Sequence, residues 1–234
     1  MKNGNGISVI IPTLNEEAAI APLIQHLRHH ATGYIQIIIS DGGSADNTAF
    51  VASAANSKVV LSQKKGRAAQ MNYGASFATE PVLYFVHADC IPPNNFYSKI
   101  LSSVREGFAL GRFQTKFNSN SWLLKLNAFF TRFDWGICSG GDQTLFFRKE
   151  LFSEINGFNE ELILMEDYDI VKRARQNFSY AILNDKVLVS ARKYTDNSWL
   201  KVQQAHHTII KMYQKGASQE VLLEKYRQLL NYRY

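Results

Sequence analysis

Polar, titratable side chains directly follow two of the apolar runs in this chain. His87-Ala88-Asp89 comes after the run Val82–Val86, and Asp41 comes after the run Tyr34–Ile39. Short apolar runs of this kind predict strands of a buried sheet, and in an open α/β sheet ligands bind beyond the carboxyl ends of the strands. Because side chains alternate along a strand, we expect His87 and Asp89 to point toward the same ligand. These residues predict a binding site at one edge of the sheet.

Two glycine-containing turns accompany these polar residues. Gly42-Gly43 follows Asp41 and lets the backbone turn tightly beside a ligand, although the same residues fit a plain loop with Asp46 as the N-cap of the next helix. Gly66-Arg67 opens a predicted helix whose N-terminal amides favour an anion, although a cluster of Lys and Arg is also typical of a solvated loop. The residues alone leave both alternatives open at each turn.

Further along, the acidic pair Glu166-Asp167 stands at the start of the predicted helix 166–176. Acidic residues in a first helical turn are stabilised by the helix dipole, which is a purely structural explanation. Upstream, Ser139–Gln143 is a glycine turn before a predicted strand and fits a plain turn equally well. The first strand ends in Pro12–Glu17, which contains neither G-x-G-x-x-G nor GxxxxGK[ST], so a dinucleotide-binding Rossmann protein and a P-loop enzyme are excluded.

The elements that must hold these residues alternate between strand and helix in the first half of the chain. Unbroken apolar strands between amphipathic helices predict a parallel sheet covered on both faces, here a Rossmann-like βαβαβαβ unit. The second half is less regular and predicts further strands and helices. The predicted strands are 7–11, 34–39, 58–61, 82–86, 108–117, 144–147 and 180–191, and the predicted helices are 16–30, 46–55, 67–78, 94–106, 122–133, 166–176, 198–214 and 218–230.

Composition and charge restrict the class of protein. The 234 residues suit one α/β unit over residues 1–191 with a helical extension over 192–234. No stretch approaches the ~18 apolar residues of a membrane-spanning helix, and the N-terminus predicts a first strand and not a signal peptide. Two cysteines form neither a disulfide framework nor a zinc site, so we expect a cytoplasmic protein. The pI of about 9.2 comes without a nucleic-acid-binding motif, and no nucleic acid partner is expected.

Taken together, the motifs resemble those of the family 2 glycosyltransferases, which have the GT-A fold. They occur in the family's order over roughly residues 7–175, and each is weak alone but specific in combination. The closest likeness is to a small bacterial branch, the radical-SAM/selenodomain-associated transferase 2 proteins. The matching stretches are SVIIPTLNEE, IISDGGSADNT, GRAAQMNYGA, YFVHAD, GGDQTLFFRKELF…GF and MEDYDIVKRAR.

The resemblance implies a role for each matching residue. Asp167 would be the general base with Glu166 beside it, and Asp89 would ligate a divalent cation, Mg²⁺ or Mn²⁺. His87 stands where most members have the first Asp of D-x-D, which leaves its role open. The remaining residues fall into a nucleotide-binding set, namely Pro12, Thr13, Asn15, Glu16, Asp41, Gly42, Arg67, Gln70, His87, Ala88 and Asp89, and a set facing donor sugar and acceptor, namely Gly141, Asp142 and Gln143.

The function implied is an inverting transfer of a sugar from a UDP- or GDP-sugar to an unknown hydroxyl acceptor. The Q-x-x-R-W motif of processive synthases is missing, because Arg192 and Trp199 do not reproduce its spacing. One alternative is a sugar-nucleotidyltransferase, which would need a glycine-rich basic loop after the first strand. Another is a non-catalytic nucleotide-sugar-binding protein, although the presence of both Asp89 and Asp167 argues against it.

The basic charge of the chain is concentrated near its C-terminus. From Arg192 to Tyr234 eight Lys or Arg stand against three Asp or Glu, which gives +5 of the total of +6. In the predicted helix 198–214, Lys201 and Lys211 lie on a different face from the apolar residues, and Lys215 follows on that face just beyond the helix. Two interpretations follow. Either the helix packs its apolar stripe on the protein with its lysines solvated, or the segment docks on anionic lipid at the inner face of the membrane, near a lipid-linked acceptor.

Overall fold

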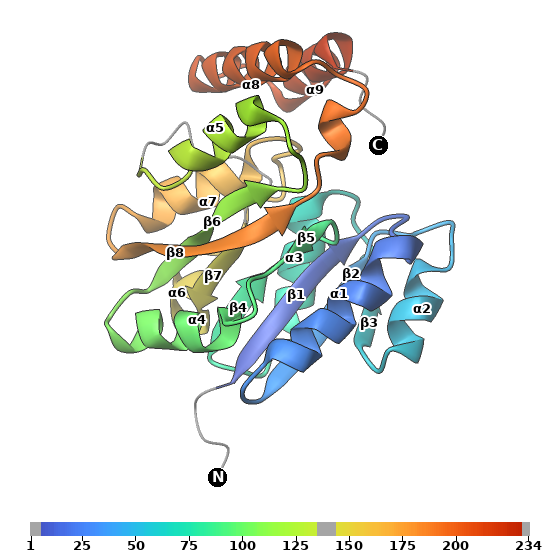
Figure 1. Cartoon of the computed structure of the whole chain (residues 1–234), viewed down its shortest axis with the longest axis vertical. Coiled ribbons are helices and arrows are strands. Elements are labelled where there is room, and N and C mark those ends of the chain that lie inside the picture. Colours follow the sequence, from blue (N-terminus) through green and yellow to red (C-terminus); the bar gives the residue numbers. More distant parts are fainter. Residues whose placement is uncertain (1–5, 135–143, 231–234) are drawn as a thin grey trace.

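A single sheet organises the chain, seen in Figure 1 in a computed structural model that describes residues 6–134 and 144–230. Within those ranges the sheet has eight strands in the order β3-β2-β1-β4-β7-β6-β8-β5. Helices cover both of its faces, which is the predicted α/β architecture with a mostly parallel sheet. The strands are β1 (Ile7–Thr13), β2 (Ile35–Asp41), β3 (Lys58–Leu61), β4 (Val82–Phe85), β5 (Cys90–Ile91), β6 (Leu110–Phe117), β7 (Leu145–Arg148) and β8 (Tyr180–Val189).

The first half of the sheet forms because its strands are apolar on both faces. β1 pairs in parallel with β2 and with β4, and β2 pairs in parallel with β3. All seven residues of β1 are buried, as expected for a central strand between two layers of helices. The predicted Rossmann-like unit is therefore confirmed, and its strands direct their carboxyl ends to one edge of the sheet.

The helices divide into two layers. One face of the sheet packs against α1, α2 and α4, and the other packs against α3, α6 and α7. At Gly74 of α3 a Cβ atom would lie 2.7 Å from the Cγ2 of Ile10, so glycine permits the close approach of α3 to β1. The helices are α1 (Glu17–His30), α2 (Thr48–Ala54), α3 (Arg67–Ser76), α4 (Phe96–Arg105), α5 (Trp122–Phe130), α6 (Lys149–Glu154), α7 (Glu166–Ala174), α8 (Trp199–Gln214) and α9 (Gln219–Leu229).

Mixed pairing characterises the second half of the sheet. β7 runs antiparallel to both β4 and β6, β8 is parallel to β6, and β5 is antiparallel to β8. The sequence did not predict β5, α6 or the short 3₁₀ helix Arg192–Tyr194, because two to six residues carry too little periodicity to be recognised.

The C-terminal helices α8 and α9 form a hairpin beside α5 (Figure 1). The apolar residues Val202, Ala205 and Ile209 of α8 are buried against α9 and against Leu164, which precedes α7. The apolar stripe of α8 is thus used within the protein. Over the described residues, none of the helices combines the length and the apolar character needed to cross a bilayer.

Candidate active site

The carboxyl ends of five strands, β1, β2, β4, β6 and β8, lie at one edge of the sheet. β1, β2 and β4 are parallel, and two antiparallel steps through β7 make β6 and β8 parallel to them as well. Their carboxyl ends therefore share an edge with the start of α7, whose preceding loop returns to this side. The sequence predicted this edge from the first strands, and the structure adds the end of β8.

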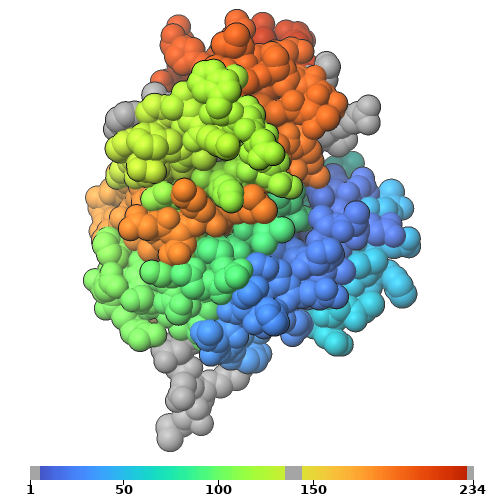
Figure 2. Space-filling view, in the orientation of Figure 1, coloured from blue at the N-terminus to red at the C-terminus, as the bar shows by residue number. Residues whose placement is uncertain are grey.

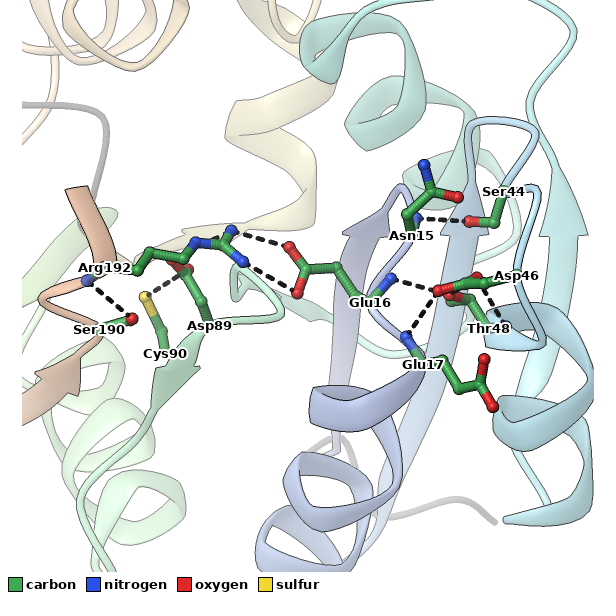
Figure 3. Close-up of polar contacts among 10 residues, drawn as sticks. All are labelled: Asn15, Glu16, Glu17, Ser44, Asp46, Thr48, Asp89, Cys90, Ser190 and Arg192. Atoms are coloured by element: carbon green, nitrogen blue, oxygen red, sulfur yellow. Dashed lines mark hydrogen bonds and ion pairs between the residues drawn. The ribbon is translucent and has the colours of Figure 1, made fainter. Parts of the chain in front are cut away.

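The loops after β1 and β2 are bonded to each other over this edge. Asn15 donates its backbone N–H to the hydroxyl of Ser44 at 2.9 Å, and its side-chain oxygen accepts from the backbone N–H of Ala45 at 2.8 Å. Glu16 donates its N–H to the Thr48 hydroxyl at 2.8 Å. Figure 3 shows these contacts running from one loop to the other. These hydrogen bonds therefore fix the two loops relative to each other.

Asp46 also links these two loops, and its position corrects one prediction. The N-cap of α2 is Asn47, not Asp46. The Asp46 carboxylate instead accepts hydrogen bonds from the backbone N–H of Thr48 at 3.0 Å and of Glu17 at 3.2 Å. These bonds hold the pKa of the Asp46 carboxyl below its ordinary value, with the Thr48 side chain as the largest cause. Asp46 thus bridges the first turns of α1 and α2.

Asp41, at the end of β2, is buried and fully hydrogen-bonded. Its Oδ1 accepts from the backbone N–H groups of Gly43 and Ser44 at 3.0 and 2.8 Å. Its Oδ2 accepts from the hydroxyls of Ser44 and Thr13 at 2.6 and 3.1 Å. A carboxylate has about four acceptor positions, so these four donors fix the orientation of Asp41.

Gln70, on α3, links β1 and β2 through two hydrogen bonds. Its Nε2 donates to the backbone carbonyls of Thr13 at 2.7 Å and Ser40 at 2.9 Å. A Cβ at Gly42 would lie 2.8 Å from that nitrogen, which explains glycine at this position. Gln70 is buried, and in this structure its amide nitrogen bonds to the protein backbone.

The segment His87-Ala88-Asp89 is a turn and not the end of a strand, so the predicted alternation is wrong. β4 ends at Phe85, and the N–H of Cys90 donates to the carbonyl of His87 at 3.0 Å to close the turn. His87 and Asp89 consequently approach different partners. The Nε2 of His87 lies 3.8 Å from the Oδ2 of Asp167, while the Oδ2 of Asp89 lies 3.4 Å from the Nη2 of Arg192.

Arg192 joins two predicted site residues. Its guanidinium donates to both carboxylate oxygens of Glu16, at 2.8 and 3.2 Å, while also facing Asp89 (Figure 3). Sequence analysis did not assign Arg192 to the site. The available signal was a basic residue just beyond a strand, but the direction of that strand could not be inferred in the irregular second half.

Glu166 and Asp167 open α7 as predicted, and both are buried. Arg67 forms an ion pair and a hydrogen bond with Glu166. Burial raises the pKa of the Glu166 carboxyl above its ordinary value, against the opposing effect of Arg67, and the neighbouring Asp167 raises it further. The Asp167 Oδ2 is also buried, yet it has no hydrogen-bond partner among the described residues.

An unbonded buried carboxylate oxygen is costly, so it calls for an explanation. Arg67 bonds to the neighbouring Glu166, and the Nε2 of His87 lies 3.8 Å from the Asp167 Oδ2, beyond hydrogen-bond distance. Among the described residues, the Asp167 Oδ2 therefore has an acceptor position that no hydrogen bond uses. Of the predicted residues, Gly141, Asp142 and Gln143 lie outside the described residues.

The carboxylates around Asp89 fit a hard divalent cation whose remaining coordination positions are filled by a bound ligand. Within residues 6–134 and 144–230 no three His, Cys, Asp or Glu side chains gather as a ready-made metal cage. Mg²⁺, however, is commonly held by one or two carboxylates together with substrate phosphates. Asp89 and Glu16 supply carboxylate oxygens here, and a cation, the Arg192 guanidinium, already lies against both of them.

Known proteins share this sequence pattern and this fold. A glucosyl-3-phosphoglycerate synthase from Mycolicibacterium smegmatis is 28% identical over 105 residues, which cover 41% of this chain and 35% of the relative. The chain spans about a third of the length of the curated relatives it matches.

Two solved structures show the likeness in three dimensions. Residues 1–349 of TarS from S. aureus in complex with UDP-GlcNAc give a TM-score of 0.67 at 19% identity, covering 80% of this chain and 58% of that one. A mannosyltransferase from Pyrobaculum calidifontis in complex with GDP-Man and Mn²⁺ gives a TM-score of 0.68 at 15% identity, covering 95% and 69%. The predicted GT-A fold is confirmed. The model of the glycosyl transferase family 2 matches residues 8–158, more than half of the chain, and the protein belongs to that family.

Proposed function

We propose that this protein is an inverting, divalent-metal-dependent glycosyltransferase that uses a UDP- or GDP-sugar. The observation that carries the proposal is the pair of carboxylates at one sheet edge. Asp89 is partly exposed and faces a cation, whereas the Asp167 Oδ2 is buried and has no hydrogen-bond donor within residues 6–134 and 144–230. These are the environments expected of a metal ligand and of a base that awaits a hydroxyl. Membership of the family supports the reaction class.

In this reaction Asp167 would receive the proton of the acceptor hydroxyl as its oxygen attacks the anomeric carbon. General base catalysis of this kind is typically worth ~10²–10⁴-fold in rate. One displacement with one base inverts the anomeric configuration. A divalent cation held by Asp89, Mg²⁺ or Mn²⁺, would offset the charge on the departing nucleoside diphosphate. Arg67 keeps Glu166 in place beneath the base.

On the nucleotide side, Asp41 and Thr13 would line the base, with Pro12, Asn15 and Glu16 along the nucleoside. Because four intramolecular donors already bond to Asp41, a base N–H would have to replace one of the two hydroxyl donors. The TarS and mannosyltransferase structures hold UDP-GlcNAc and GDP-Man, which supports either base. Gly141, Asp142 and Gln143 remain a prediction for the sugar and acceptor.

A thermal-shift screen tests the proposed donor class. UDP, GDP and their sugar derivatives would be added with and without Mn²⁺. A ligand at ~100 times its dissociation constant raises the free energy of unfolding by about 2.7 kcal/mol, which is readily detected. We expect stabilisation by one nucleotide class, larger with Mn²⁺. An unchanged melting temperature with every nucleotide at millimolar concentration would contradict the proposal.

We further propose a peripheral position at the inner face of the membrane, where the helical extension 192–234 contacts anionic lipid. Its basic face on α8 is exposed, with Lys201, His207, Lys211 and Lys215 all facing solvent. Each Lys or Arg near such a surface contributes ~1 kcal/mol. The likeness to the radical-SAM/selenodomain-associated branch and the cytoplasmic location stay predictions.

Exposed apolar residues on α8 and on the neighbouring α5 support the proposal that these helices face the membrane. Trp122 is 70% exposed on α5, and Leu200 is 73% exposed on α8. The indole Nε1 of Trp199 donates to Asn127 Oδ1 at 3.2 Å, which links the two helices. Figure 2 shows the yellow-green α5 segment bulging from the molecule directly below the orange C-terminal helices. Aromatic side chains beside lysines are typical of interfacial helices.

Vesicle sedimentation separates docking from a purely structural role. The triple variant Lys201→Gln, Lys211→Gln, Lys215→Gln keeps the buried face of α8 intact. The control Arg28→Gln, Arg105→Gln, Lys172→Gln removes the same charge from other exposed positions. We expect wild type and control to sediment with phosphatidylserine vesicles at low salt only, and the α8 triple variant to stay in solution. Equal sedimentation of all three proteins would refute a role for this face.

A further inference from the structure

Arg192 occupies a position that the proposed reaction has not used. Its guanidinium lies against Glu16 and Asp89, the two carboxylates at the junction of the nucleotide loops and the end of β8. We propose that Arg192 is a built-in cation that competes with the divalent metal for these carboxylates, and that it turns onto the diphosphate when metal and donor bind together. This inference rests on the proposed function, since it concerns how metal and donor bind at that site.

The backbone holds Arg192 close to Asp89. Ser190, at the end of β8, donates its N–H to the carbonyl of Asp89 at 3.1 Å, and Arg192 donates its N–H to the Ser190 hydroxyl at 3.2 Å. Two residues further on, Tyr194 packs edge to face on Phe117 with ring centroids 5.8 Å apart. Figure 3 shows the side chain of Arg192 reaching from this anchored turn across to Glu16. The contact therefore follows from the fold of the segment.

The side chain of Arg192 is far more exposed than the two carboxylates that it contacts. Arg192 is 62% exposed, whereas the side chains of Glu16 and Asp89 are 15% and 26% exposed. Exposed ion pairs contribute little to stability because water screens them. These two ion pairs can therefore be exchanged at small cost, but the two carboxylates, which are more buried, need a cation in place of the guanidinium. A divalent cation satisfies that need, because it is smaller than the guanidinium and carries a higher charge.

Arginine is also suited to the second position. Its planar fork of N–H donors matches two phosphate oxygens. A diphosphate brought to Asp89 with its metal would lie next to the turn that carries Arg192, and would offer the released guanidinium a better partner than an exposed carboxylate. Without the diphosphate, a metal ion must expel Arg192 into water with no compensation. The enzyme should therefore bind metal weakly alone and much better with nucleotide.

Mn²⁺ affinity without nucleotide provides the test, measured from the free-ion signal in electron paramagnetic resonance. The variants are Arg192→Gln, which removes the competing charge, and Arg192→Lys, which retains it. Arg28→Gln, an exposed arginine bonded to the carbonyl of Asn56 outside the proposed site, controls for net charge. Calorimetric titration with UDP and GDP, with and without Mn²⁺, accompanies each protein.

We expect Arg192→Gln to bind Mn²⁺ alone about three- to tenfold more tightly than wild type, as loss of an exposed pair and of cation repulsion predicts. The gain in nucleoside diphosphate affinity that Mn²⁺ provides should be smaller in Arg192→Gln than in wild type, and Arg192→Lys should resemble wild type in its Mn²⁺ affinity. Unchanged, weaker or undetectable Mn²⁺ binding by Arg192→Gln overturns the inference. If wild type then still binds a nucleoside diphosphate with Mn²⁺, the proposed function stands; if it binds neither UDP nor GDP, the function itself fails.

Discussion

Two regions of the candidate site differ in how their carboxylates are hydrogen-bonded. The proposed nucleotide side consists of the loops after β1 and β2, and the proposed transfer side is the start of α7. Asp41 accepts four hydrogen bonds from the protein, and Asp46 bridges two helix starts. On the transfer side, Asp167 is as deeply buried as Asp41, yet its Oδ2 has no donor within the described residues. The acceptor positions of Asp41 are thus all used within the protein, whereas the described part of the chain leaves one oxygen of Asp167 without a hydrogen bond.

This difference separates binding from chemistry. In the proposed function, loops that are already ordered would bind the nucleotide without a cost of ordering them, whereas a base must keep a lone pair available for the proton that it receives. Asp89 and Arg192 lie between the two sides, with charges that are satisfied by an ion pair exposed enough to be exchanged. The comparison predicts that substitutions on the two sides fail in different ways.

The largest effect should come from Asp167→Asn, which alters only the transfer side. The amide keeps the shape of the side chain but cannot take a proton, so we expect transfer to slow ~10²–10⁴-fold. The dissociation constant of the nucleotide sugar should stay within about twofold of wild type, because the substitution affects the chemical step and not the binding of the donor. Single-turnover kinetics with calorimetry measures both quantities. Transfer at close to the wild-type rate would show that Asp167 is not the base.

Asp89→Ala should break the junction between the two sides. We expect the fold to survive, because Asp89 is partly exposed and its carboxylate contacts only the exposed Arg192 and the Cys90 thiol among the described residues. The affinity for nucleoside diphosphate should become independent of Mn²⁺, since the proposed metal ligand is gone. Calorimetry with and without Mn²⁺ decides the matter. A metal dependence equal to that of wild type would remove Asp89 from the metal site.

Asp41→Asn should damage the nucleotide side through stability as well as binding. The introduced amide nitrogen faces donors that previously bonded to a carboxylate oxygen, and hydrogen bonds to charged groups contribute ~1.5–3 kcal/mol each. We expect the free energy of unfolding to fall by about 2–3 kcal/mol in urea titrations. As a control, Asp167→Asn should leave stability nearly unchanged, because the Asp167 Oδ2 makes no hydrogen bond to any described residue. Equal stability losses in the two variants would erase the contrast.

The smallest effect is a pH dependence from Glu166. Its folded-state pKa is raised by burial above the ordinary 4.5, so above that value the folded protein binds more protons than the unfolded chain. The contribution of Glu166 to stability is therefore present below pH 4.5 and is lost as pH rises through the folded pKa. The free energy of unfolding of wild type minus that of Glu166→Gln should fall over this window. A difference that rises with pH would reverse the assignment.

The positions of Asp41, Glu166 and Asp167 in the fold could be predicted from the sequence, because each lies at the end or start of an element with a clear pattern. β1, β2 and β4 are continuous apolar runs, so their ends located Asp41 and the edge of the sheet. The start of α7 at Glu166-Asp167 was also predicted from the sequence. Each of these features is local and extends over several residues of one pattern.

The contacts between segments could not be predicted in the same way. The turn at His87-Ala88-Asp89 depends on the pairing of the two-residue strand β5 with β8, ninety or more residues later in the chain and too short to show a period. Arg192 meets Glu16 only because β8 runs parallel to β6. The missing donor of Asp167 is a property of the packed structure, and no residue pattern reports it.

Donor cleavage followed by proton NMR tests the central claim most directly, because water can replace the unknown acceptor. The nucleotide sugar selected by thermal shift would be incubated with the protein and Mn²⁺, and the anomer of the first sugar released would be recorded before mutarotation. We predict release of nucleoside diphosphate with an inverted anomer, lost in Asp167→Asn at equal donor occupancy. A retained anomer, or release that persists undiminished in Asp167→Asn, would contradict the account.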